Sequence, residues 1–273
     1  MPHRSKFELL ARSGYFARGI VFLLVAGLAL LSGVTGGKAD TKGAVSKLFE
    51  QPFGRIWVAL IGFGLLGFVA WRLAQSLADS DGHGRDKKAI VSRLAMLGSA
   101  ITYIFLAYYA LSQALSGIRG SEGTGEKGLA QWVMSQPFGS YVAMVIGLGF
   151  IIGGVVTSMK GLSRKFEKYL HLPDTNGILG MICVYGLVAR GLVFAITGMF
   201  FAYAGLTLDP EQAGGISDAL LSLRQLPFGA VVYIVVAAGM AAFGIYNLVE
   251  ARYRVVRGPS VRDIKHSLSE RRI

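Results

Sequence analysis

Two arginines are the side chains of this 273-residue chain whose type and position point most directly to chemistry. Arg18 and Arg190 stand in near-identical motifs, "ARGIVF" and "ARGLVF", each at the start of a long apolar run. A charge at such a boundary is costly unless water or a partner meets it. Either both side chains snorkel to the nearest polar surface, which is the simpler interpretation, or they form a paired cationic site. Such a site would hold an anionic lipid, an anionic solute or a partner carboxylate.

Glu250 is the acidic side chain placed to meet these arginines. It lies 23 residues after Pro227, at the end of the last apolar run, and so at the depth we expect for Arg18 and Arg190. The sequence therefore predicts that Glu250 pairs with Arg190, or with Arg18 from another part of the fold. We interpret this as a structural ion pair, with a coupling site for proton or ion movement as the alternative.

The elements that must position these residues are apolar helices. The chain has 53% hydrophobic and 16% charged residues and a mean hydropathy of +0.51, which is too apolar for a water-soluble surface. Six segments are long and nearly free of charge, and with their flanks each reaches the roughly 20 residues that span a bilayer. They are residues 19–34, 56–71, 94–118, 140–159, 191–208 and 230–249. The pattern predicts an all-α integral membrane protein with six transmembrane helices.

The basic residues predict how the chain crosses the membrane. Of the 28 Lys and Arg, 19 fall in the segments on the side of the N-terminus and only 7 in the three opposite loops. This is the positive-inside pattern, so we expect a multi-pass protein of a bacterial inner membrane with both termini cytoplasmic. The formal charge of +12 then reports topology and contact with anionic lipid, and we expect no nucleic-acid partner.

Other motifs carry little chemistry. The chain has a single cysteine, Cys183, and four scattered histidines, so neither a disulfide framework nor a metal site is predicted. "GTGEKG" at 123–128 formally fits a nucleotide-binding glycine pattern, but it follows an apolar run rather than a strand, and we interpret it as a loop. Aromatic side chains such as Tyr103 are interpreted as interface anchors and packing. We therefore expect no catalytic residues and no cofactor.

A five-residue motif that ends in Pro-Phe-Gly, which we call the corner, occurs three times: "EQPFG" at 50–54, "SQPFG" at 135–139 and "QLPFG" at 225–229. Its turn residues are Pro52, Phe53, Gly54, Pro137, Phe138, Gly139, Pro227, Phe228 and Gly229. "ARGIVF" and "ARGLVF" precede the first and third corners, and we place "AITYIF" at 100–105 in the same position of the middle copy, without the arginine. The repeated unit is thus one hairpin of two membrane helices.

Each corner follows a short amphipathic stretch, which predicts a helix lying in the outer interface. Proline should end that helix and occupy the first turn of the next one, where its missing N–H is harmless. We expect phenylalanine to anchor the corner against the interface and glycine to allow close backbone approach. The corner is therefore predicted to turn the chain from lying on the membrane to entering it.

Because each unit has two spans, all copies enter from the same side, and we predict three parallel two-helix repeats in a pseudo-threefold bundle. The predicted units are residues 1–79, 90–166 and 178–256, followed by a basic cytoplasmic tail at 257–273. Small residues should make the helix contacts, since close packing replaces the hydrophobic drive in lipid. The candidates are Gly27, Gly33, Gly62, Gly64, Gly67, Gly147, Gly149, Gly153, Gly154, Ala237, Ala238 and Gly239.

These features resemble a bacterial membrane family, the domain of unknown function 1206. The resemblance rests on the three paired-helix units, the "ARG" of the first helix, the Pro-Phe-Gly corner and the ending "YNLVEARYR" at 246–254. It covers residues 9 to about 256. It implies the fold and the membrane address, and it implies no activity.

The sequence alone favours a non-enzymatic accessory or scaffold subunit. Its expected partners are membrane lipids, through Arg18, Arg190 and Glu250, and another membrane protein or a second copy of the chain. The alternative is a small-solute or ion transporter or channel, with a path near the pseudo-threefold axis. Few other intramembrane polar groups are visible in the sequence, which favours the scaffold.

Overall fold

The computed structural model describes residues 6–35, 52–77, 87–116, 133–170, 177–209 and 212–255. Six long helices are found there: α1 (Lys6–Thr35), α3 (Gly54–Leu77), α4 (Lys87–Ser116), α6 (Gly139–Leu162), α7 (Ile178–Thr207) and α9 (Gly229–Tyr253). All six are long and apolar enough to cross a membrane. The prediction of an all-α protein with six spans is confirmed.

The three hairpins share one register. The first helices, α1, α4 and α7, are each 30 residues long, so Arg18 and Arg190 are both the thirteenth residue of their helix. The equivalent residue of α4 is Ser99, and Tyr103 is then equivalent to Phe22. Our sequence alignment of "AITYIF" was therefore displaced by two residues, because it matched an alanine shared by chance and ignored where the helix begins.

Each second helix begins at the glycine of a corner. The preceding Phe53, Phe138 and Phe228 all adopt a left-handed backbone, with φ of 60°, 61° and 58°. Proline is therefore one residue outside the N-cap, and our placement of it in the first helical turn is wrong. The left-handed phenylalanine makes the sharp bend instead. Its side chain points outward in all three copies and is between 75% and 86% exposed.

The corner glycines allow a close approach of backbone, as predicted. A Cβ added to Gly139 would lie 2.2 Å from the carbonyl oxygen of Val133, and one added to Gly229 would lie 2.2 Å from that of Arg224. Any larger residue would collide with the backbone of the preceding turn, which cannot yield as a flexible side chain does. The corner thus needs glycine for space.

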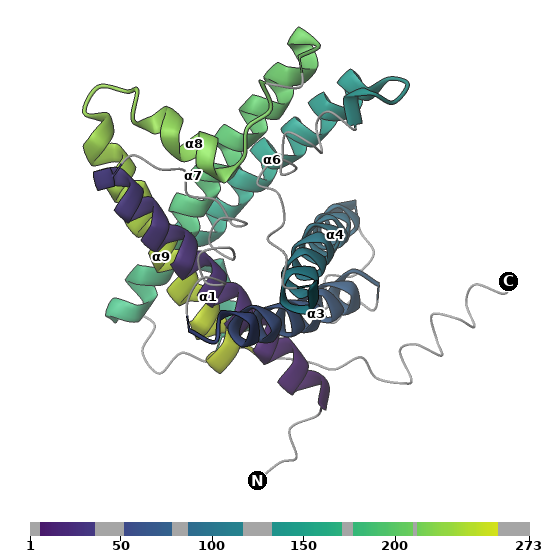
Figure 1. Cartoon of the computed structure of the whole chain (residues 1–273), viewed down its shortest axis with the longest axis vertical. Helices are drawn as coiled ribbons and strands as arrows, with labels where there is room; N and C mark the ends of the chain where they lie inside the picture. Colours follow the sequence, from purple (N-terminus) through teal and green to yellow (C-terminus); the bar gives the residue numbers. More distant parts are fainter. Residues whose placement is uncertain are drawn as a thin grey trace, which may run out of the picture.

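The six helices pack as an incomplete ring. Each first helix packs against the second helix of the preceding unit, giving the pairs α3 with α4, α6 with α7, and α1 with α9. Within the units, α1 packs on α3 and α7 on α9, whereas α4 and α6 form no comparable interface among the described residues. Figure 1 shows the α3–α4 and α6–α7 pairs diverging from the crossing of α1 and α9. Five of the six interfaces of a closed six-helix ring are present among the described residues, and the pseudo-threefold symmetry stays a prediction.

Small residues decide how closely these helices approach. Along the α6–α7 interface, a Cβ added to Gly154 would lie 2.5 Å from the carbonyl oxygen of Gly191, and one added to Gly147 would lie 2.6 Å from that of Gly198. On each helix these glycines are seven residues apart, which is about two helical turns, so they lie along one face of the helix. The backbones can touch because no side chain separates them.

The predicted glycine contacts hold for some positions and fail for others. Contacts between helices are confirmed at Gly62, Gly64, Gly67, Gly147, Gly154 and Gly239. Gly27, Gly149 and Gly153 face open space, with no atom within 4 Å of an added Cβ, so their prediction is wrong. The failure has a positional cause: Gly149 and Gly153 lie on α6, which does not pack on α4.

The amphipathic helix of the third unit is α8 (Ile216–Leu223). Its Ala219, Leu220 and Leu223 are buried and join the core formed with α1, α7 and α9. Its apolar face therefore turns to the bundle, and its interfacial location stays a prediction. The stretch of the first unit, that of the second unit before Val133, and the tail at 257–273 lie outside the described residues.

Candidate functional site

Arg18 lies inside the helix bundle. It is 4% exposed, and its Nε donates a hydrogen bond of 2.7 Å to the hydroxyl of Tyr103 on α4. Its guanidinium carbon is 4.8 Å from the ring centroid of Phe68 on α3 and 5.2 Å from that of Phe243 on α9. Side chains of four helices thus surround this charge.

Arg190 reaches the same place from α7. It is 8% exposed, and its guanidinium carbon lies 4.0 Å from the ring centroid of Phe194 and 4.4 Å from that of Phe243. It also lies beside the Tyr103 hydroxyl. Both arginines contact the ring of Phe22, at 5.7 Å for Arg18 and 4.9 Å for Arg190. The structure thus brings together the two arginines that the repeat predicted as a pair.

We call this group the arginine centre: Arg18, Arg72, Arg190, Tyr103 and the phenylalanines Phe22, Phe68, Phe194 and Phe243. Arg72 belongs to it because its guanidinium carbon lies 4.9 Å from the ring of Phe68 and it donates to Gln75. All long helices except α6 contribute to the centre.

The arginine centre carries positive charge without a carboxylate. Among the described residues, no Asp or Glu forms an ion pair with Arg18, Arg72 or Arg190. The Nη1 of Arg190 and the Nε of Arg72 are buried and have no hydrogen-bond partner. Aromatic rings attract a guanidinium through their negative faces but do not neutralise it. An oxyanion would satisfy both the charge and the free donors.

Two sequence interpretations are therefore corrected. Arg18 and Arg190 do not snorkel to the surface, because their side chains are enclosed by helices. Tyr103 is not an interface anchor: it is 7% exposed and accepts a hydrogen bond from Arg18. Its role was missed because the sequence alignment was displaced by two residues; the correct register shows a tyrosine where the other units have phenylalanine.

The predicted pairing of Glu250 is wrong. Glu250 is 3% exposed and forms its ion pair with Arg254, one turn further along the chain. Arg254 also lies over the ring of Tyr15, at 5.3 Å. Arg254 caps the C-terminal end of α9 only four residues after Glu250, whereas Arg18 and Arg190 lie on other helices, so the local pair forms instead.

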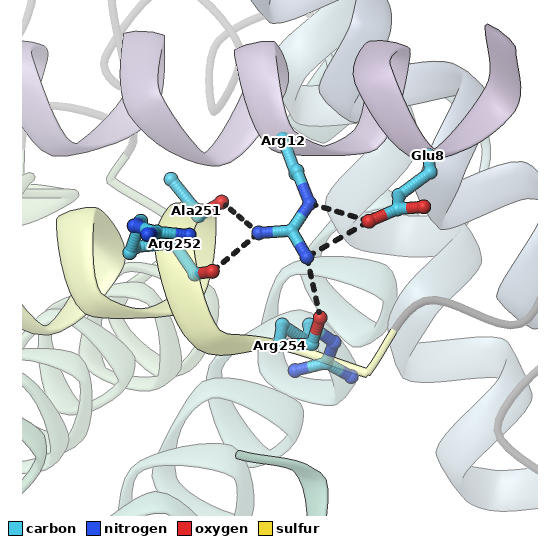
Figure 2. Close-up of polar contacts among 5 residues, drawn as sticks. All are labelled: Glu8, Arg12, Ala251, Arg252 and Arg254. Carbon is cyan, nitrogen blue, oxygen red and sulfur yellow. Dashed lines mark hydrogen bonds and ion pairs between the residues drawn. The ribbon is translucent and has the colours of Figure 1, made fainter. Parts of the chain in front are cut away.

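Arg12 holds the end of α9 in place. Its guanidinium donates hydrogen bonds to the carbonyl oxygens of Ala251 at 2.8 Å and Arg252 at 2.5 Å, and pairs with Glu8 at 2.9 Å. Figure 2 shows Arg12 between Glu8 on α1 and the last carbonyls of α9. A cation there satisfies carbonyls that have no helical partner and favours the negative end of the helix dipole.

Arg93 makes the same contact in the second unit. It occupies the position equivalent to Arg12, and its Nε donates to the carbonyl oxygen of Ser76 at 2.6 Å, while Nη2 donates to that of Leu77 at 2.9 Å. The two arginines fasten the ends of α9 and α3. Their role is structural, and it supports the register that the helix bounds define.

Fold and site together define a polytopic α-helical membrane protein built from three hairpin units around a buried cationic centre. The chain belongs to the family described as Domain of Unknown Function (DUF1206), whose family model matches residues 13–79, 94–164 and 185–254. It is similar to Uncharacterized protein YxxB of Bacillus subtilis (strain 168), with 32% identity over 250 residues that cover 89% of this chain and 90% of the relative. No solved structure matches.

Proposed function

We propose that this protein is a non-enzymatic scaffold or accessory subunit of the inner membrane that binds an oxyanion in the arginine centre. The proposal rests on one observation: the buried guanidinium groups of Arg18 and Arg190 meet beside the half-buried Arg72, and no described carboxylate pairs with any of the three. The oxyanion is a phosphate ester or a carboxylate, carried by a lipid, a small solute or a partner protein.

The choice of ligand follows from the chemistry of arginine. A guanidinium presents donors in a planar fork that matches two oxygens of a phosphate or carboxylate. Charges within a membrane protein are costly and mark binding sites or pathways unless they are paired. The remaining walls of the centre are phenylalanine rings, which bind apolar groups. These residue types favour binding over catalysis.

Transport is a second candidate because the arginine centre lies at the convergence of five helices. Polar atoms of Gln113, Thr197 and Asn247 are also buried without a hydrogen-bond partner. Transport predicts uptake of a labelled anion into proteoliposomes that Arg190→Gln abolishes. We expect no such uptake, since phenylalanine rings surround the arginines on several sides.

The binding proposal is tested by thermal unfolding of the purified full-length protein after lipid removal. One arm adds inorganic phosphate in detergent, and the other places the protein in nanodiscs of phosphatidylcholine with or without phosphatidylglycerol. We expect one of these anions to raise the melting temperature of the wild type and to have little effect on Arg18→Gln with Arg190→Gln. Stabilisation by phosphate indicates a small oxyanion, and stabilisation by phosphatidylglycerol alone indicates a lipid.

The matched control is Arg55→Gln, since Arg55 binds the carbonyl oxygens of Ala114 and Leu115 away from the centre. This variant should keep the response to the anion. Equal stabilisation of the wild type and the double variant, or none in either arm, would contradict the proposal.

A further inference from the structure

The three units fill the arginine centre unequally. At the position of Arg18 and Arg190 the second unit has Ser99, and at the position of Phe68 and Phe243, sixteen residues after the corner proline, it has Gly153. The first and third units therefore place arginine and phenylalanine side chains in the centre, whereas the second unit contributes only Tyr103. The second unit therefore contributes no cation from α4 and no aromatic ring from α6 to the centre.

The ring of helices is open between the two helices of this unit, α4 and α6. In the first unit a Cβ added to Gly64 would lie 2.5 Å from the Cβ of Ala17, and in the third a Cβ added to Gly239 would lie 2.3 Å from that of Ala189. The equivalent residues of the second unit are Gly149 and Gly98. Neither has an atom within 4 Å of an added Cβ.

We define the open seam by Gly98 on α4 with Gly149 and Gly153 on α6. Its borders are apolar and exposed: Ile101 is 48% and Ile152 is 50% exposed. Gly153 is equivalent to Phe68 and Phe243, which line the arginine centre, and in that centre the buried Nη1 of Arg190 has no acceptor. An apolar surface facing the hydrocarbon and a buried positive charge together complement an amphiphile with an anionic head.

We propose that the open seam is the lateral binding site of an anionic phospholipid. One acyl chain lies along Gly98, Gly149 and Gly153, where the absence of side chains leaves room, and the phosphate pairs with Arg190 and Arg18. This inference rests on the proposed function and adds the ligand class and the route. A free solute anion would not enter through a seam that opens toward hydrocarbon, because a charged group is not soluble there.

The test introduces a phenylalanine side chain at the position where the second unit has glycine. Gly153→Phe places phenylalanine where Phe68 and Phe243 stand, and the open space around Gly153 accommodates it. In nanodiscs of phosphatidylcholine with increasing phosphatidylglycerol, native mass spectrometry should show binding of phosphatidylglycerol weakened about tenfold or more. Gly27→Phe is the matched control, since Gly27 also faces open space but lies on α1 outside the seam.

Arg190→Gln separates this inference from the proposed function. If Arg190→Gln loses the lipid while Gly153→Phe binds like the wild type, the arginine centre stands and the seam is overturned. If Arg190→Gln keeps the lipid, the lipid does not bind through the arginine centre and this inference is overturned, while the phosphate arm described above tests the proposed function separately. Gly149→Leu provides a second seam variant should Gly153→Phe not assemble.

A variant-free measurement locates the acyl chain directly. Phosphatidylglycerol with a diazirine on one acyl chain is irradiated with the wild-type protein, and the cross-linked peptides are mapped. We expect cross-links on α4 around Gly98 and on α6 between Gly149 and Gly153, which excess unlabelled phosphatidylglycerol removes. Competed cross-links confined to other helices would overturn the proposal.

Discussion

Arg18 and Arg190 are 172 residues apart in the chain, yet their guanidinium groups lie against the same two rings, Phe22 and Phe243. These rings pack edge to face, with centroids 4.9 Å apart. The equivalent pair one unit along is Tyr103 with Phe68, edge to face at 4.8 Å. The repeat thus reproduces an aromatic contact between units, and the two arginines are placed around it.

Removal of one buried charge should stabilise the lipid-free protein. Arg190→Met removes the desolvation cost and the repulsion between neighbouring guanidinium groups while keeping an unbranched apolar side chain. Replacement of buried charges by apolar residues often raises stability by about 1 to 4 kcal/mol. Unfolding of lipid-depleted protein in detergent would show this, and a variant less stable than the wild type would argue that Arg190 already has a partner.

Loss of the Tyr103 hydroxyl should destabilise the fold. Tyr103→Phe leaves the Nε of Arg18 buried without its acceptor, and a hydrogen bond to a charged group is worth about 1.5 to 3 kcal/mol. Tyr108→Phe, on the same helix but 72% exposed, is the control and should change little. Equal free energies of unfolding for the two variants would show that Tyr103 does not hold Arg18.

Valine should destabilise the fold at one of two adjacent glycines of α6 and have little effect at the other. Gly154→Val drives a Cβ to 2.5 Å from the carbonyl oxygen of Gly191 and must move α6 away from α7, whereas Gly153→Val meets open space. Overpacking of this kind costs about 1 to 3 kcal/mol or more. Thermal unfolding of both variants in detergent makes the comparison, and similar losses would refute the packing described for α6.

Neutralising Glu250 should weaken the fold through Arg254. Glu250→Gln leaves the buried Arg254 without its carboxylate, and breaking a buried ion pair costs about 3 to 5 kcal/mol. Combination with Arg254→Met should recover part of that loss, because the buried positive charge is then gone as well. A double-mutant cycle in detergent measures the coupling, and an additive result would contradict the pair.

The membrane class, the six helices and the threefold repeat could be predicted because each rests on local information. An apolar run of about 20 residues identifies a span wherever it packs, and the spacing of Pro52, Pro137 and Pro227 defines the units without any knowledge of contacts. The need for glycine at Gly139 and Gly229 is equally local, since it concerns the turn just before each of them.

The partners of the charged side chains were decided by tertiary structure. Glu250 has Arg254 within one turn, and Arg18 meets Tyr103 only because α1 and α4 both reach the centre of the bundle. In lipid, apolar faces do not choose one another by hydrophobicity, so the faces that meet are selected by close fit at small residues. A sequence shows many small residues, but it does not show which residues of another helix they contact.

The open seam is the clearest case of this division. Gly149 and Gly153 look in the sequence like the glycines that pack, and Gly147 and Gly154 beside them do pack. The helix turns about 100° at each residue, so neighbouring glycines face different directions. Only the placement of α7 on one face of α6, with α4 absent from the other, decides which of them is covered.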